Sequence, residues 1–380
     1  MEDRLFDVDA LRVAVADQDT MVRADRQPPQ TDDGLLLSPG WVEVIPGASF
    51  GVSAGEALAI IGESASGKSL TLLGAFGLLP GGTRAIGGRT TFAGKRFLPA
   101  GAPLPEEATT SWRHRRRRTK ELEQAGSVLA DYGDEEWRTV MGTEIGFLFQ
   151  NPIAAWAPVY AIGEQAGEAL GEHTGLSNEE IHGRVFDALG EVHLPKSRRF
   201  FGALREEISR GQGQRAMLAA ALLKVPRLLI ADEPLSGLDA PVAAAIMDLI
   251  KDLQRQRNMA LVVVTHDLAA VARLADRVAV MYGGRIIEEG PIGDVFHHPR
   301  HPYTSGLLRS IPAFSRGRLD PIPGEAPRLV DIMQGRCAFA DRCPHVVEKC
   351  HTLEPSLEQG GPSLVACHRA AELELPGVAR

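Results

Sequence analysis

Three short groups of residues in this chain are suited to binding and cleaving a phosphate ester. The run Gly62 to Ser69 matches the phosphate-binding pattern G-x-x-x-x-G-K-[ST] at every defined position. Small residues let backbone N–H groups close around phosphates, Lys68 reaches the terminal phosphates, and the Ser69 hydroxyl can hold Mg²⁺. The other two groups are the adjacent acids Asp232-Glu233 and His266. The first group alone predicts an ATP or GTP site.

The residues that flank the phosphate-binding run predict the setting that it needs. Residues 57–61 are short and apolar, like a buried parallel strand, and residues 70–73 resemble the first turns of an amphipathic helix. Strand, loop and helix in this order favour a phosphate loop over a chance turn rich in glycine and serine.

The two acids and the histidine each follow an apolar strand-like run. Asp232 can order the Mg²⁺ shell while Glu233 polarises the attacking water, because phosphoryl transfer needs positioning and charge neutralisation. A solvated strand end is the alternative, but adjacent acids after residues 228–231 are poor structural choices unless a cation lies there. His266 follows residues 262–265, at the edge where α/β sheets bind ligands, which predicts contact with a γ-phosphate or with water.

The elements that must position these groups indicate an α/β fold. Residues 11–15, 41–45 and 90–92 read as strands of a small β-subdomain. Four further strands are expected at 145–149, 227–231, 261–264 and 277–281. Two helices at 240–257 and 267–275 would connect the later strands, which predicts a parallel sheet with crossover helices. Residues 160–224 predict three helices, the second beginning near Ser177 and followed by a break at Leu194-Pro195.

Length and charge limit the class of protein. With 380 residues, the chain predicts one main domain and a C-terminal appendage. The net charge of -8 argues against a basic footprint for nucleic acid over the whole domain. No segment approaches the roughly 20 apolar residues of a membrane span, and the acidic N-terminus does not resemble a signal peptide. We therefore expect a cytosolic chain whose contact with a membrane comes through partners.

Residues 95–140 differ in character from the rest. Prolines precede the basic run at 113–118, and an acidic patch follows at 131–136. The mixture predicts an inserted loop and a solvated helix, because charge runs usually face water. A nucleic-acid or lipid-headgroup patch is the alternative.

All four cysteines lie close together near the C-terminus, at Cys337, Cys343, Cys350 and Cys367. In a reducing compartment this favours a ligand set over disulfides. Four thiolates suit an iron-sulfur cluster or tetrahedral zinc, and unligated thiols are the third possibility. The lack of a C-x-x-C pair weakens the zinc hypothesis, although three histidines are near in sequence, namely His345, His351 and His368.

The order of motifs resembles the nucleotide-binding subunit of an ABC transporter over residues 10 to 290. The matching segments are Walker A, the Q-loop residue Gln150, the signature 208–212, Walker B ending at Glu233, the D-loop 236–239 and the switch histidine His266. The resemblance implies a P-loop ABC ATPase core at 1–290, with an N-terminal antiparallel β-subdomain and an inserted helical subdomain at about 153–224.

The resemblance also implies a role for each motif residue. ATP would bind at Gly62, Glu63, Ser64, Ala65, Ser66, Gly67, Lys68, Ser69 and Leu70. The Mg²⁺ ligands would be Ser69, Gln150 and Asp232, and the catalytic residues Glu233, His266 and Gln150. In that family two subunits close head to tail, so the partner's ATP would meet Ser209, Arg210, Gly211, Gln212 and the D-loop residue Asp239.

Two positions depart from the family pattern. The aromatic residue that stacks on adenine in the family corresponds here to Val15, with Trp41 as a substitute. The signature has Arg210 where the family has glycine. The sequence therefore predicts altered base stacking and an unequal pair of ATP sites.

The end of the chain is similar to the C-terminal extension of dipeptide and oligopeptide importer ATPases. The resemblance rests on residues 300–308, residues 321–324 and the four cysteines. It implies an extension at 291–380 and a [4Fe-4S] cluster on Cys337, Cys343, Cys350 and Cys367.

These features together suggest an ATPase subunit that powers peptide uptake. Its partners would be a second, non-identical ATPase subunit, two membrane permease subunits and an extracytoplasmic solute-binding protein, which would place it at the cytoplasmic face of the membrane. The alternatives are a soluble ABC ATPase serving an enzyme complex or DNA repair, and an importer of nickel or another small solute. The sequence of residues 301–303 argues against an exporter.

Overall fold

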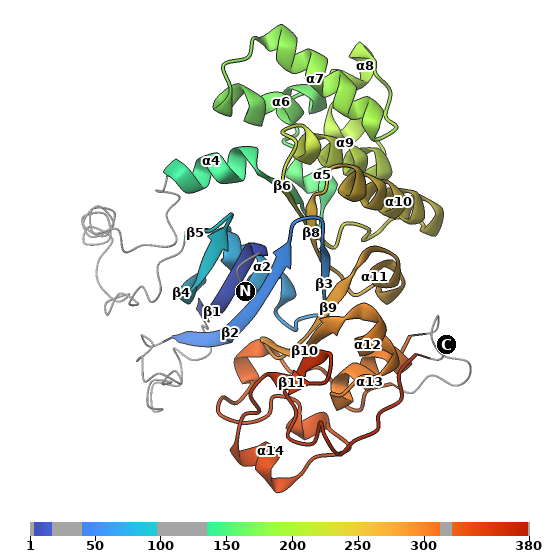
Figure 1. Ribbon diagram of the computed structural model, residues 1–380. Helices are drawn as coiled ribbons and strands as arrows, with labels where there is room; N and C mark the ends of the chain where they lie inside the picture. Colours follow the sequence, from blue (N-terminus) through green and yellow to red (C-terminus); the bar gives the residue numbers. More distant parts are fainter. Residues whose placement is uncertain (1–3, 17–39, 97–134, 312–320, 379–380) are drawn as a thin grey trace, which may run out of the picture. The chain divides into compact units, whose positions relative to one another are not determined.

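The computed structural model describes residues 4–16, 40–96, 135–311 and 321–378 (Figure 1). The chain divides into two compact units. Unit 1 contains Val52–Ala59 and Asp134–Ala275, together with the first four residues. Unit 2 contains Leu5–Gly51, Ile60–Gly133 and Asp276–Arg380. Most of the predicted insertion, including the basic run at 113–118, lies outside the described residues, as does the polar stretch at 17–39.

A four-stranded sheet in unit 2 confirms the predicted β-subdomain. Its order is β2-β1-β4-β5, and the strands span Trp41–Ser53, Arg4–Ala16, Thr83–Phe92 and Lys95–Arg96. Strands β1 and β4 pair antiparallel, with Phe6 opposite Phe92. Helix α2 (Lys68–Phe76) packs on this sheet, because the ring of Phe76 stacks on that of Phe6 with centroids 4.9 Å apart. The helix that carries Lys68 is thereby held on a buried apolar face.

The C-terminal part of unit 2 contains the predicted strand at 277–281 and adds three antiparallel strands that the sequence did not predict. Strand β9 (Arg277–Tyr282) pairs with β10 (Arg285–Pro291), and β10 pairs with β12 (Ser363–Val365). The edge strand β11 (Glu358–Gly360) completes this arrangement. The C-terminal extension (residues 291–380) therefore continues a sheet that starts before it, as the orange and red segments of Figure 1 show.

Short helices and turns are the other regular elements of the C-terminal extension. Helices α12, α13 and α14 span Ile292–His297, Pro302–Arg309 and Glu348–Thr352, and the 3₁₀ turns η3 and η4 span Leu329–Asp331 and Ala340–Arg342. Pro302 occupies the first turn of α13, where a missing N–H costs nothing.

Unit 1 contains three of the four strands predicted for the parallel sheet, and the fourth, at 277–281, lies in unit 2 and pairs antiparallel with β10. Strands β6 (Ile145–Leu148), β7 (Leu228–Asp232) and β8 (Ala260–Val264) pair parallel in the order β6-β7-β8. Helices α10 (Ala240–Gln256) and α11 (Leu268–Leu274) follow β7 and β8. Strand β3 (Ala57–Ile61), with all five residues buried, begins in unit 1 and ends in unit 2.

Helices form the other part of unit 1 and include the three predicted between 160 and 224. These are α6 (Ile162–His173), α7 (Asn178–Glu191) and α9 (Arg210–Leu222). Ser177 caps α7 in a capping box with Glu180, as its position predicts. Four shorter elements complete this part, namely α4 (Glu135–Thr143), α5 (Pro152–Ala155), α8 (Arg198–Phe201) and η1 (Arg205–Glu207), and the sequence did not predict the last two.

Over the described part of the chain, no helix combines the length and the apolar composition that a membrane crossing requires. The domain boundary expected at 290 remains a prediction.

Candidate nucleotide site

The phosphate loop in unit 2 follows β3 and leads into α2. A Cβ atom at Gly62 would lie 2.2 Å from the carbonyl oxygen of Met281, so the backbones touch there and only glycine fits. Gly67 has a left-handed φ of 102° and a Cβ would lie 2.6 Å from the Ile45 side chain. Gly62 is therefore required by the close approach of another backbone, and Gly67 by its left-handed conformation.

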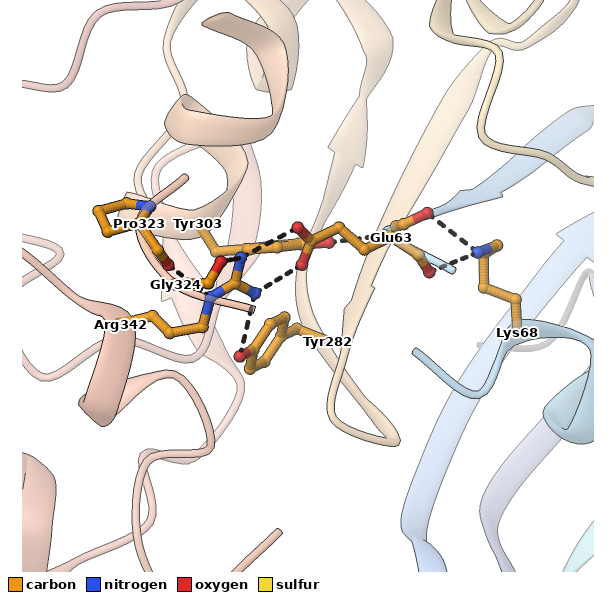
Figure 2. A network of polar contacts seen from close by, with 8 residues as sticks. Glu63, Lys68, Tyr282, Tyr303, Pro323, Gly324 and Arg342 are labelled. Atoms are coloured by element: carbon orange, nitrogen blue, oxygen red, sulfur yellow. Dashed lines mark hydrogen bonds and ion pairs between the residues drawn. The ribbon is translucent and has the colours of Figure 1, made fainter. Parts of the chain in front are cut away.

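Buried polar groups in this loop fit a phosphate ligand. The Ser66 hydroxyl is buried and has no hydrogen-bond partner among the described residues, which is costly unless an outside group supplies one. The Lys68 Nζ atom donates to the carbonyl oxygens of Gly62 and Glu63, each at 2.9 Å (Figure 2). Ser64 and Ala65 are exposed at the tip, and Ser69 and Leu70 are half-buried in α2. A donor set of hydroxyl, ammonium and helix N-terminus suits a nucleotide triphosphate.

The two candidates for adenine stacking lie on the antiparallel sheet of unit 2. Val15 is half-buried in β1. Trp41 packs against Ala14 and Ile86, and the Arg84 guanidinium lies 5.6 Å from the centre of its ring. Trp41 therefore already has an apolar neighbour and a cation against its ring, and its contact with a base stays a prediction.

The acid pair in unit 1 lies at the end of β7. Asp232 is the last residue of the strand and is 7% exposed. Glu233 has a left-handed φ of 47°, which is rare for a residue with a side chain, and its N–H donates to the carbonyl of Val264 at 2.8 Å. Such local strain persists only where the surroundings enforce it, and it is concentrated at functional sites.

The structure brings Glu233 and His266 together, as their places after neighbouring parallel strands suggest. His266 Nδ1 lies 2.8 Å from Glu233 Oε1. The Thr265 hydroxyl donates to Glu233 Oε2 at 3.3 Å, so both carboxylate oxygens have a partner. The side chain of Glu233 is 11% exposed and that of His266 is 65% exposed. Sequence analysis missed Thr265, whose position directly before His266 was the available signal.

The Q-loop residue Gln150 is exposed directly after β6. The next residue, Asn151, caps α5 by accepting a hydrogen bond from the N–H of Ala154 at 3.2 Å. Buried Trp156 then donates from its indole N–H to the carbonyl of Gly213 in α9 at 3.4 Å. The segment after Gln150 is therefore tied to the signature helix.

The signature residues form the start of α9 in unit 1. Ser209 caps the helix by accepting from the N–H of Gln212 at 3.2 Å, and the Gln212 side chain accepts from the N–H of Ser209 at 2.8 Å. A Cβ at Gly237 would lie 2.2 Å from Arg210 Nη1, so the Arg210 guanidinium covers the D-loop of its own chain. Asp239, at the end of the D-loop, caps α10 through the N–H of Val242 at 2.9 Å.

The four cysteines of unit 2 are all free thiols. Burial raises the pKa of Cys337 and that of Cys343 to about 11, and the charges of the other cysteines contribute to each increase. Burial likewise raises the pKa of Cys367. The N–H of Cys337 donates to the carbonyl of Cys350 at 3.0 Å. Four neighbouring thiols match iron-sulfur ligand chemistry, although no group of three or more described side chains is arranged to hold a single metal ion.

Comparisons with known proteins identify the family. The model of the ABC transporter family matches residues 45–236, and that of the oligopeptide/dipeptide transporter C-terminal region matches residues 287–350. The chain therefore belongs to the ABC transporter family, and it is an ATP-binding cassette ATPase. Within that family, it carries the C-terminal region of the oligopeptide/dipeptide transporter group.

Similar proteins of known name support this membership. The chain is 38% identical to the oligopeptide transport ATP-binding protein OppD of Salmonella typhimurium, over 88% of this chain and 90% of that protein. It is 36% identical to the dipeptide transport ATP-binding protein DppD of Escherichia coli, over 81% of this chain and 85% of that protein. Both alignments extend beyond the ATP-binding segment into the C-terminal extension.

Solved structures show the same fold at low sequence identity. A dimeric ATP-binding cassette with bound ADP and Pi matches with a TM-score of 0.52 and 22% identity, over 74% of this chain and 98% of that chain. A subunit of an ABC transporter complex from Clostridium perfringens matches with a TM-score of 0.52 and 23% identity, over 78% of this chain and 91% of that chain. The predicted α/β cassette fold is confirmed.

We expect Glu233→Gln to retain ATP binding and to lower the rate of hydrolysis by about 100-fold or more, because general-base groups contribute on that scale. The amide keeps the size of the side chain but cannot accept a proton from water. Nucleotide affinity and phosphate release would be measured on the assembled complex. Glu206→Gln, at an exposed glutamate of the same unit, should behave like wild type. Wild-type turnover in Glu233→Gln would contradict the assigned role.

Proposed function

We propose that this chain is the ATP-hydrolysing subunit of an ABC importer for dipeptides or oligopeptides. The observation that carries the proposal is the presence, on one chain, of the ATP-binding cassette and the oligopeptide/dipeptide transporter C-terminal region. The names of the similar proteins from Salmonella and Escherichia coli support the choice of solute.

Each unit carries residues with a proposed role in ATP hydrolysis. In unit 2, Lys68 and the amides of the phosphate loop hold the phosphates and stabilise their charge. In unit 1, Glu233 accepts the proton of the attacking water, while Thr265 and His266 orient its carboxylate. Ser69, Gln150 and Asp232 are the proposed ligands of Mg²⁺, which would neutralise charge on the phosphate oxygens.

The proposed partners are two permease subunits, an extracytoplasmic binding protein and a second ATPase subunit, with this chain at the cytoplasmic face of the membrane. An exposed apolar surface on unit 1 supports a permease contact. Gln165 holds the preceding segment by donating to the carbonyl of Tyr160 at 2.8 Å, and the N–H of Ile162 donates to the carbonyl of Ala203 at 2.9 Å. These bonds place three exposed side chains on adjoining segments, Val159 (74% exposed), Tyr160 (59%) and Leu204 (37%).

Exposed clusters of large apolar side chains commonly mark protein contacts. A helix of a permease could bury Val159 and Tyr160 without disturbing the core of unit 1. The segment is also connected through buried Trp156 to the signature helix α9. A displacement of the permease would therefore be transmitted through Trp156 to the signature residues at the start of α9.

The proposal is tested with the reconstituted complex in vesicles. Labelled di- and oligopeptides should enter in an ATP-dependent manner, and Tyr160→Asp should lower uptake by about tenfold or more, because a buried charge disrupts an apolar contact. ATP affinity of the isolated Tyr160→Asp chain should stay at the wild-type value, and Tyr160→Phe is the matched control. ATP-dependent uptake of nickel or another small solute, with no uptake of peptides, would contradict the proposed solute.

The two ATP sites of the assembly would be unequal because of Arg210. A signature glycine permits close approach of backbone to a phosphate, whereas a side chain fills that space. The exposed Arg210 guanidinium also lies against Gly237 in the D-loop of its own chain. The site made by this signature and the partner's phosphate loop should therefore turn over slowly, and the partner should be a non-identical subunit with the usual glycine.

This asymmetry predicts unequal effects of matched lysine mutations. Lys68→Ala should lower ATP hydrolysis and uptake by at least about tenfold more than the corresponding lysine mutation in the partner, since Lys68 serves the faster site. Arg210→Gly should raise hydrolysis. Rates would be measured on the assembled complex, with Arg198→Gly at an exposed helical arginine as the control. Equal losses from the two lysine mutations, or a partner that is a second copy of this chain, would contradict the asymmetric model.

The cysteine site is proposed to bind a [4Fe-4S] cluster through Cys337, Cys343, Cys350 and Cys367. A four-iron cluster is larger than a single ion, so its thiolate ligands need not converge on one point, which agrees with the four neighbouring thiols described above. The cluster would serve as a covalent staple for the C-terminal extension, which has few long apolar runs. Tetrahedral zinc is the alternative.

Protein purified without oxygen should be brown, with visible absorption that dithionite bleaches and iron in proportion to protein. Cys350→Ser, at the most buried of the four cysteines, should lose the colour and expose the C-terminal extension to protease first. Ser356→Ala, in the same extension, is the control and should leave the visible absorption unchanged. Stoichiometric zinc without iron would contradict the iron-sulfur cluster, although the cysteines would still stabilise the extension by binding a metal.

A further inference from the structure

An ion pair joins the phosphate loop to the C-terminal extension within unit 2. Glu63 is the second residue of the phosphate loop, and Arg342 is the last residue of η4 in the extension. Arg342 Nη1 donates to Glu63 Oε2 at 2.7 Å and Nη2 donates to Glu63 Oε1 at 3.1 Å (Figure 2). The pair is bidentate, the strongest form of contact between arginine and a carboxylate.

The Arg342 guanidinium is held by more than Glu63. Its Nε atom donates to the carbonyl of Pro323 at 2.8 Å, Nη2 also donates to the carbonyl of Gly324 at 3.3 Å, and Nη1 to the Tyr282 hydroxyl at 3.4 Å. Five contacts thus match the five N–H donors of an arginine. The Arg342 side chain is only 8% exposed and that of Glu63 is 26% exposed, so the arginine is largely shielded while the carboxylate keeps some contact with solvent.

A second contact fixes the backbone of the same loop residue. The N–H of Glu63 donates to the Tyr303 hydroxyl at 2.7 Å. Tyr303 is fully buried, with its ring centre 4.6 Å from that of Tyr282 and 5.4 Å from that of Phe339. The carbonyl of Glu63 in turn accepts from Lys68 Nζ. One residue therefore connects the extension to the lysine of the ATP site.

Three sequence features of the extension, which the ATPase mechanism leaves without a role, are joined to Glu63, two of them directly and the turn through Arg342. They are Tyr303 in the run 300–308, the turn at Pro323-Gly324, and Arg342 directly before Cys343. We propose that the C-terminal extension positions the phosphate loop for ATP, with Arg342 and Tyr303 as positioning residues that act through Glu63. This inference rests on the ATPase activity and is independent of the transported solute.

Charge explains why ATP binding would depend on Arg342. An unpaired Glu63 carboxylate in the phosphate loop would repel the triphosphate, and the repulsion would be only partly screened because the Glu63 side chain is 26% exposed. The fork of Arg342 cancels that charge and fixes its position, whereas Tyr303 fixes the peptide group that carries it. Loss of either contact should weaken the binding of ATP more than it slows the chemical step.

The test measures ATP affinity of the full chain and kcat of the assembled complex. Arg342→Ala should raise the Kd for ATP by about tenfold or more, since charged hydrogen bonds contribute on this scale. At saturating ATP, kcat should change by less than about threefold. Arg336→Ala is the matched control, because Arg336 pairs with Asp341 in the same extension, away from the phosphate loop. It should leave the Kd unchanged.

A double-mutant cycle separates positioning from a loss of folding. In a Glu63→Gln background, Arg342→Ala should raise the Kd by less than about threefold, because no carboxylate is left unpaired. Tyr303→Phe keeps the buried ring and should raise the Kd by about threefold through loss of the hydroxyl acceptor. An Arg342→Ala effect of the same size in both backgrounds, or an unchanged Kd in Arg342→Ala, would overturn the proposal. Failure of peptide uptake with these Kd changes intact would contradict only the proposed solute.

Discussion

The close approach of two backbones at Gly62 is the constraint on which the phosphate loop depends. A side chain there would collide with the Met281 carbonyl, and a Cβ at Gly284 would lie 1.9 Å from the carbonyl of Val44. The N–H of Gly284 also donates to the carbonyl of Ser66 at 3.0 Å. The loop is thus fixed by main-chain atoms of the β9–β10 hairpin, which in turn lies close against the main chain of β2. Because main-chain positions vary less than rotamers, amides and Lys68 are pre-organised for phosphate.

Main-chain contacts also fix the functional group in unit 1, where Glu233 adopts a strained backbone conformation. A left-handed conformation costs about 1–3 kcal/mol for a residue with a side chain. The chain tolerates it here because the N–H of Glu233 bonds to β8 and both carboxylate oxygens contact the residues after β8. Relaxing the backbone would break these contacts together. The strained conformation therefore keeps the carboxylate where the parallel strands end.

Sequence analysis located the groups that local pattern defines. Lys68, Glu233 and His266 each follow an apolar strand at a fixed spacing, so their places at strand ends could be predicted. The partners of Glu63 could not, because Tyr303 and Arg342 lie 240 and 279 residues away along the chain. The direction of the Arg210 side chain could not be predicted either. A residue in the first turn of a helix can point several ways, and this one lies against the D-loop, which is distant in the sequence. Pairing of β10 with β12 depends similarly on distant residues and was missed.

The same contacts explain why an arginine, and not a lysine, suits position 342. A buried charge is costly unless every donor is satisfied, and the carbonyls of Pro323 and Gly324 share that task with Glu63. A lysine has three donors on one atom and could not bridge a carboxylate and a turn in one plane. The planar fork therefore couples the shape of the 321–324 turn to the charge of the phosphate loop. An acidic residue in that loop is compatible with ATP because the C-terminal extension supplies its counter-charge, so the cassette of this chain is electrostatically complete only with its extension in place.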